Sequence, residues 1–350
     1  MVIILLNSAV FVLGLTIGSF LNVCIYRMPK NISIKKPERS FCPHCNETIP
    51  WYDNIPVLSF LLLKGRCRFC KKGISFLYPL VELITAVMFL VFFNVFGASI
   101  KALVYLVLCC GLIIATFVDI RHRIIPDEIS VGGIVVGILF GGFAFAPQSN
   151  FKDMSEIFVS LLGSLIVIGF ICLVRIIWAC LQEFLSKEER KEEDTNEPEE
   201  VDIKGTLREL LLLIPAGAIG WYGFRFMIPI MYSAPGYVIG ILTALIGASV
   251  GASIIYITAI IGDLVFRKES MGGGDIKLLA AIGAFLGWQQ VLLTFMLAPF
   301  FGAIVGIIVK IVKKTSLIPY GPFLSMAALM VLFWYNEIMQ WWSSRLYQGF

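Results

Sequence analysis

The chain has 350 residues, of which 58% are hydrophobic and 15% are charged, and its formal net charge is +4. Runs of 18 or more apolar residues recur along its length, and each is long enough to cross a bilayer. This composition excludes a soluble domain with one large core, and the small net charge does not indicate nucleic-acid binding. We therefore predict an all-α polytopic membrane protein with no nucleic-acid partner.

About ten transmembrane helices are predicted from the apolar runs. The first run carries no basic residue before it, whereas Arg27 and Lys30 follow it, which favours a retained helix over a cleaved signal peptide. The run over 276–288 is short, and Gly287-Trp288 indicates a turn at the membrane interface. In chain order, the predicted spans are 2–26, 77–96, 101–118, 129–146, 155–181, 209–232, 235–265, 276–288, 289–312 and 317–340.

The positions of the basic residues predict an orientation. If the N-terminus lies outside, 23 of the 28 Lys and Arg residues fall in inner loops. Inner loops of membrane proteins carry such an excess of positive charge. We therefore expect the N-terminus outside and the ends of the spans near Asp119 and Asp275 at the cytoplasmic face.

The first inner loop, residues 27–76, contains two Cys-x-x-Cys pairs. They are Cys42-Pro-His-Cys45 and Cys67-Arg-Phe-Cys70. Two such pairs can place four thiolates around one tetrahedral ion, and a loop in a reducing cytosol favours a metal over disulfides. Four cysteines complete the coordination shell, so we predict a structural zinc site in a small zinc-ribbon-like domain.

Two aspartates are candidates for chemistry. Asp275 follows Gly272, Gly273 and Gly274, which allow the backbone of another segment to approach closely. Asp119 ends the third predicted span at the same predicted membrane depth. Two carboxylates that meet in a low dielectric share one proton, so one can activate water while the other protonates a carbonyl. The alternative for Asp119 is a rim carboxylate neutralised by a nearby arginine.

These features together resemble the type IV prepilin peptidases, which belong to the glycine-x-glycine-Asp intramembrane aspartyl proteases. The resemblance covers most of the chain outside 147–240. It is carried by the two cysteine pairs, GSFLNVCIYRMP (18–29), YPLVEL (78–83), the block from Asp119 to Pro126, and MGGGDIKLLAAIGAFLGW (271–288).

The resemblance implies an enzyme of the bacterial inner membrane that cleaves the leaders of prepilins or pseudopilins at the cytoplasmic face. It matches Asp119 and Asp275 to the catalytic pair. It also implies N-methylation of the new terminus from S-adenosylmethionine, for which the sequence assigns no residues. Asp127 and Glu128 are candidate contacts for a basic leader. The alternatives are a non-enzymatic assembly component of a pilus or secretion machine and a proton-coupled transporter.

The sequence departs from the family pattern in one long segment. Residues 147–240 look like an added helical pair joined by a charged loop over 183–208, rich in Glu, Lys and Asp. We thus expect five regions: a first helix (1–26), a four-cysteine zinc-binding domain (27–76), helices with the first aspartate (77–146), the insertion (147–240) and helices with the GGGD motif (241–340).

Overall fold

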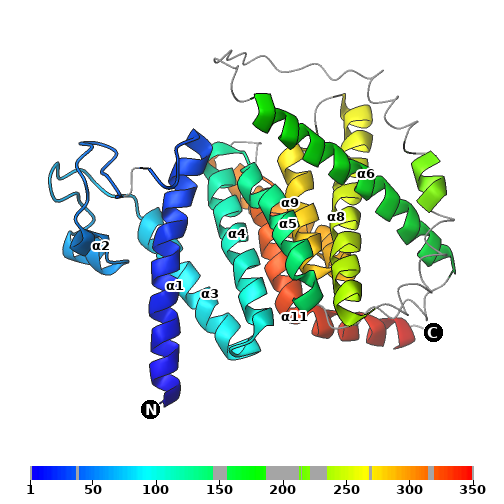
Figure 1. The fold of residues 1–350 in the computed structure, drawn as a ribbon, viewed down its shortest axis with the longest axis horizontal. Coiled ribbons are helices and arrows are strands. Elements are labelled where there is room, and N and C mark those ends of the chain that lie inside the picture. Colours follow the sequence, from blue (N-terminus) through cyan, green and yellow to red (C-terminus); the bar gives the residue numbers. More distant parts are fainter. Residues whose placement is uncertain are drawn as a thin grey trace. The chain divides into compact units, whose positions relative to one another are not determined.

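The computed structural model describes residues 2–36, 39–144, 156–186, 213, 215–220, 235–267, 270–313 and 319–348. These residues are mostly helical, and the described part contains no β-strand, only the isolated bridges Phe41–Thr48 and Arg66–Gly73 (Figure 1). The chain forms two compact units, Met1–Pro126 and Asp127–Phe350, which are described separately below. The all-α prediction is confirmed.

The first unit contains three long helices, α1 (Val2–Arg27), α3 (Leu77–Phe96) and α4 (Ile100–His122). Helices α1 and α3 approach closely because Gly14 and Gly18 face the backbone of α3, where an added Cβ would lie only 2.6–2.7 Å from main-chain atoms. Between these two helices the chain leaves for the cysteine-rich loop. The loop holds three short helices, η1 (Met28–Lys30), η2 (Trp51–Asn54) and α2 (Leu58–Leu62).

The second unit is built around the short helix α9 (Gly273–Leu286), whose residues from Leu278 to Leu286 are all buried. The longer helices α8 and α5 pack against it (Figure 1). Gly247 of α8 and Gly283 of α9 lie so close that a Cβ on either would overlap the other's carbonyl. The unit also includes, in chain order, α5 (Asp127–Ala144), α6 (Glu156–Ser186), α8 (Gly236–Phe266), α10 (Trp288–Lys313) and α11 (Gly321–Gln348).

Six of the described helices are long and apolar enough to cross a membrane. Helix α9, at 14 residues, is shorter than a spanning helix needs, and Gly287 ends it with φ 85. The short piece and its terminal turn therefore match the expectation for 276–288. The count of about ten spans stays a prediction, since 209–232 and the charged loop lie largely outside the described residues. The six candidates are Val2–Lys30, Leu77–Phe96, Ile100–His122, Gly236–Phe266, Trp288–Ile308 and Gly321–Arg345.

Candidate functional site

Four cysteine thiols meet in the loop between α1 and α3. The Sγ atoms of Cys42, Cys45, Cys67 and Cys70 all lie within 4.8 Å of one another. Those of Cys42 and Cys70 are 3.9 Å apart. A tetrahedral zinc site with Zn–S bonds of about 2.3 Å has sulfur–sulfur edges of about 3.8 Å, whereas a disulfide is about 2.05 Å long. The cluster therefore has the size and chemistry to hold a metal ion.

The two cysteine pairs fold as copies of one turn. In each, the N–H of the first cysteine (Cys42 or Cys67) donates to the carbonyl five residues later, at 2.9 and 2.8 Å. The residue after each second cysteine adopts a left-handed backbone, with φ 57 at Asn46 and φ 58 at Lys71. Asn tolerates this conformation better than Lys does. The repeated turn aims both pairs of thiols at one point.

Within the first pair, Cys42 is the thiol that is set up electrostatically to ionise, whereas the pKa of Cys45 is raised to about 11. Burial opposes ionisation of Cys42, but the backbone N–H groups of His44 and Cys45, together with neighbouring thiols, lower the pKa of Cys42 to about 7. A thiolate is the form that ligates metal. His44 itself is exposed and stands outside the cluster, which agrees with a shell made of four cysteines.

An ion pair joins the second cysteine pair to helix η2. The Arg68 guanidinium donates two hydrogen bonds to the Asp53 carboxylate, both at 2.6 Å. These hydrogen bonds lower the pKa of Asp53. The Asp53 side chain is buried while that of Arg68 is half exposed, so the pair closes one side of the domain.

The first unit also contains an open cavity of about 530 Å³ between the four-cysteine domain and the ends of the helices. Helix α1 contributes Asn22 and Arg27 to its lining, α3 contributes Glu82, and α4 contributes Arg121. Its volume is typical of sites for small organic molecules. The sequence analysis did not find this cavity, because its walls come from segments as far apart as residues 19 and 121.

Glu82 is a central polar group of this cavity. The side chain is buried, and its Oε2 accepts a hydrogen bond from the backbone N–H of Val57 at 2.8 Å. Nearby, Asn22 Nδ2 donates to the carbonyl of Tyr78 at 2.9 Å. Both side chains are thus held in place by main-chain groups, and buried polar groups held in this way keep a fixed orientation.

Asp119 lies in the last turn of α4, and only 6% of the residue is exposed. Its carbonyl accepts from the N–H of Arg123 at 2.9 Å. Arg123 ends the helix in a left-handed conformation with φ 57, which few residues other than glycine adopt. A buried carboxylate at a helix end is a strong functional candidate.

Asp275 lies in the first turn of α9, where the helix dipole favours a negative charge. Its backbone N–H donates to the carbonyl of Gly272 at 3.1 Å. A Cβ added at Gly273 would meet nothing within 4 Å, and one added at Gly272 would meet only the Asp275 carboxylate, at 3.9 Å. No described part of the protein therefore requires these glycines for packing, and the space beside them is open.

An ion pair and a buried tyrosine accompany Asp275 within the second unit. Lys277 Nζ lies 2.7 Å from Asp127 Oδ1 and ties the start of α9 to the start of α5. Asp127 is therefore paired with a lysine, although its side chain is 40% exposed, and its contact with a basic leader stays a prediction. The Tyr320 hydroxyl is buried, has no hydrogen-bond partner among the described residues, and lies within electrostatic range of Asp275. Tyr320 is not among the residues that the sequence patterns predicted for the site.

The structure therefore brings the four cysteines together and places the glycines beside Asp275. Asp119 and Asp275 belong to different compact units, so their convergence stays a prediction.

Comparison with known protein families gives two matches. Residues 12–96 match the bacterial peptidase A24 N-terminal domain, and residues 210–307 match the type IV leader peptidase family. The first match includes all four clustered cysteines and Glu82, and the second includes Asp275. Asp119 lies between the matched segments. No solved structure gives a significant match.

Curated relatives resemble the chain over most of its length. A prepilin leader peptidase/N-methyltransferase of Aeromonas salmonicida is 28% identical over 97% of this chain and 94% of its own. One of Myxococcus xanthus is 31% identical over 85% of this chain and 61% of its own. The type 4 prepilin-like proteins leader peptide-processing enzyme of Escherichia coli O78:H11 is 29% identical over 91% of each chain.

Proposed function

The chain belongs to the type IV leader peptidase family, and we propose that it is a membrane aspartyl peptidase that removes the leader peptides of type IV prepilins and pseudopilins. The observation that carries this proposal is the match of both the N-terminal and the peptidase family models to separate parts of one chain. The match favours an enzyme over a non-enzymatic assembly component of a pilus or secretion machine.

Asp119 and Asp275 are the proposed catalytic residues. One carboxylate, ionised, takes a proton from the attacking water, while the other, protonated, donates to the carbonyl oxygen of the scissile peptide bond. The burial of Asp119 and the position of Asp275 at a helix N-terminus support unequal protonation of the two groups. The tetrahedral intermediate then collapses: the carboxyl that took the proton from water gives it to the leaving amine, and the other carboxylate takes back a hydroxyl proton as the C=O bond re-forms.

The open space beside Gly272 and Gly273 supports an extended substrate backbone lying against Asp275. The substrate's hydrophobic helix stays among the spans and its short leader stays in the cytoplasm. This requires the predicted topology, in which the N-terminus lies outside and the active site lies at the cytoplasmic side of the bacterial inner membrane.

The test is cleavage of a purified prepilin by the full-length protein in proteoliposomes, followed by mass spectrometry of the product. We expect Asp119→Asn and Asp275→Asn each to lower the cleavage rate at least about 100-fold. Asp263→Asn is the matched control, because Asp263 Oδ1 accepts a hydrogen bond from the Ser270 N–H and has no proposed part in the chemistry. Near-normal cleavage by either catalytic variant, at unchanged thermal stability, removes that residue from the role.

We propose zinc as the metal of the four-cysteine cluster, in a structural role. Four cysteines leave no coordination position for a substrate, so Cys42, Cys45, Cys67 and Cys70 would hold the ion and close the domain. Elemental analysis of the purified protein tests this: about one zinc per chain is expected, and a chain that folds without bound metal contradicts it.

We further propose that the methyl donor, S-adenosylmethionine, binds in the cavity that Glu82 and Asn22 line. When bound, it supplies an electrophilic methyl group. The cavity has a suitable volume and a buried carboxylate that can accept hydrogen bonds from hydroxyl or amino groups. The names of the relatives, which combine both activities, support a methyl donor for this chain, and the cavity's volume and buried carboxylate support its position.

Glu82→Gln separates the two proposed activities. The amide oxygen can still accept from Val57, so the fold is expected to persist, while the charge is lost. We expect weaker binding of S-adenosylmethionine by calorimetry and a correctly cleaved product that lacks the added methyl mass. Unchanged binding and methylation would place the donor elsewhere.

A further inference from the structure

The four-cysteine domain exposes an unusual number of large apolar side chains on and around helix α2. Leu61 and Leu62 are 65% and 72% exposed, and Leu58 is also exposed. Trp51 of η2 is 77% exposed. A small domain in water does not normally leave such a group uncovered, and exposed apolar groups of this kind mark sites of contact with a partner or a membrane.

A hydrogen bond fixes the position of these side chains along the axis of helix α3. The N–H of Val57, directly before α2, donates to Glu82 Oε2 at 2.8 Å. Glu82 lies five residues beyond Leu77, the first residue of α3, which is about 7 Å along the helix axis. The start of α2 therefore lies beside the opening turns of a predicted membrane span and not far out in the cytoplasm. In the predicted topology, that level corresponds to the interface between headgroups and acyl chains.

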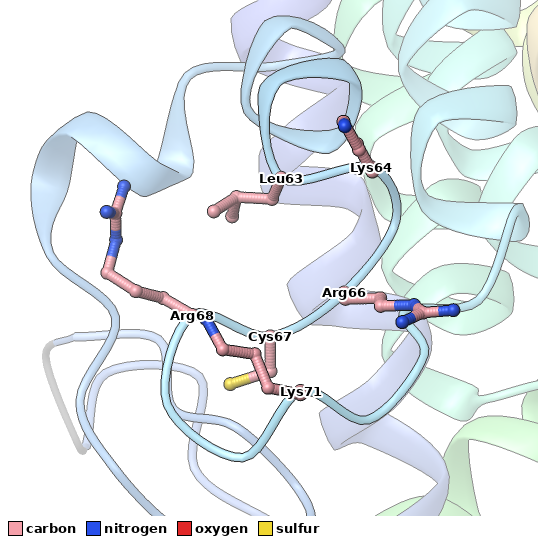
Figure 2. Close-up of a pocket in the computed structure, with 6 residues that line it drawn as sticks. All are labelled: Leu63, Lys64, Arg66, Cys67, Arg68 and Lys71. Carbon is pink, nitrogen blue, oxygen red and sulfur yellow. The ribbon is translucent and has the colours of Figure 1, made fainter.

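The same part of the domain is strongly basic. Residues 58–76 contain five Lys and Arg residues and no Asp or Glu. Figure 2 shows the pocket that the chain forms after α2, about 330 Å³ in volume, with Leu63, Lys64, Arg66, Cys67, Arg68 and Lys71 in its lining.

One of these cations is already neutralised, whereas three others are not. Arg68 pairs with Asp53, but Lys64, Arg66 and Lys71 form no ion pair within the described residues. All three are exposed. Cations beside exposed leucines are the composition of a surface that binds anionic lipid, in which the apolar groups enter the acyl boundary and the cations meet phosphates.

We propose that α2 and the second cysteine turn rest on the anionic cytoplasmic leaflet beside α3, with Leu58, Leu61 and Leu62 at the acyl boundary and Lys64, Arg66 and Lys71 at lipid phosphates. The charge of this surface matches anionic lipid and would repel a basic leader peptide. An acidic protein could match the charge, but it would not account for leucines placed at the level of a spanning helix.

Hydrogen–deuterium exchange of the full-length protein in nanodiscs tests this surface. Helix α2 has only one turn, so its amides exchange quickly unless something covers them. We expect exchange over 57–64 to be at least about fivefold slower in nanodiscs containing phosphatidylglycerol than in purely zwitterionic ones. Equal exchange in both lipids would overturn the proposal, as would protection that requires added prepilin or another protein.

Two sets of variants sharpen the test. Leu61→Asp with Leu62→Asp should abolish the lipid-dependent protection and reduce crosslinking of a photoactivatable phosphatidylglycerol to 57–72. Lys35→Glu with Lys36→Glu changes charge in the same loop but outside this surface, and should retain the protection. Zinc content equal to that of the unaltered protein shows that each variant keeps its fold. Protection retained in the leucine variant, at normal zinc content, contradicts the proposal.

Discussion

The cysteine cluster and the segment around Asp275 are both candidate sites, yet they are built in different ways. The cluster is made by two local turns that repeat the same main-chain hydrogen bonds, so each turn positions its own thiols. Asp275 stands in a helix whose position is set by packing against α8 and α5, which come from other parts of the chain. A locally built site depends on its ligand for stability, whereas a packed site depends on the whole fold and can leave open space for a substrate.

The largest effect expected from this comparison concerns the metal ligands. Cys42→Ser should release the ion and unfold the four-cysteine domain, since a domain without an apolar core depends on its metal by several kcal/mol, on the order of 5. Elemental analysis measures the loss of the ion, and hydrogen–deuterium exchange over residues 40–74 measures the unfolding. Cys110→Ser, at a cysteine outside the cluster, is the control. Full protection of 40–74 without bound metal would show that the turns are stable by themselves.

Gly273→Ala probes the open space beside Asp275. Nothing lies within 4 Å of the added Cβ, so thermal stability should not fall, while prepilin cleavage should fall roughly tenfold if substrate backbone occupies that space. Gly132→Ala, in α5, also meets nothing within 4 Å and should leave both properties unchanged. An unaffected cleavage rate in the Gly273 variant would show that the substrate backbone does not lie in this space.

Tyr320→Phe removes a buried hydroxyl near Asp275 that has no partner among the described residues. If the hydroxyl donates to Asp275 or to the substrate during the reaction, the cleavage rate should fall about two- to tenfold with little change in folding. Tyr335→Phe, which removes a hydroxyl paired with Gln289 at 3.3 Å, is the comparison variant. A rate equal to that of the unaltered protein would assign Tyr320 to packing alone.

The smallest expected effect is electrostatic and lies in the four-cysteine domain. Arg68 lowers the pKa of Asp53, so the pair stabilises the folded domain above the unfolded pKa of Asp53, and this stabilisation is lost as the pH falls through the folded pKa. Arg68→Gln should therefore lower the free energy of unfolding of the domain slightly at pH 7, where Asp53 is ionised in both the folded and the unfolded state. Urea unfolding of Arg68→Gln, Asp53→Asn and the double variant at pH 7 measures the pair, and single effects that add fully in the double variant would contradict it.

Sequence reasoning succeeded where the determinants are local. The Cys-x-x-Cys spacing predicted the thiol cluster, and the Gly287-Trp288 pair predicted the end of the short helix. The place of Glu82 near the start of a span favours a hydrogen-bonded or snorkelling rim residue, and the structure shows the hydrogen bond, from the Val57 N–H.

Long-range contacts and backbone conformations could not be predicted from local sequence patterns. The spacing of Asp263 and Arg267 by four residues favours an ion pair on one helix face, but Arg267 leaves the helix at φ 54 and the Asp263 carboxylate accepts from the Ser270 N–H. The Asp127–Lys277 pair joins residues 150 positions apart, which no local pattern can predict. Tyr320 had one signal, its place between Pro319 and Gly321 at the start of a span. The meeting of Asp119 with Asp275 and the status of 147–240 as an insertion stay predictions.

The Val57–Glu82 hydrogen bond has a consequence for the order in which the two proposed activities would be lost. It joins the main chain of the four-cysteine loop directly to the buried carboxylate of the cavity. If the loop holds zinc and the cavity holds the methyl donor, as proposed above, gradual chelation should disturb the cavity while α9, in the other compact unit, keeps its internal packing. Pilins made under zinc starvation would then be cut at the correct bond yet carry an unmethylated amine, and the ratio of the unmethylated to the methylated mass would report the zinc supply of the cell.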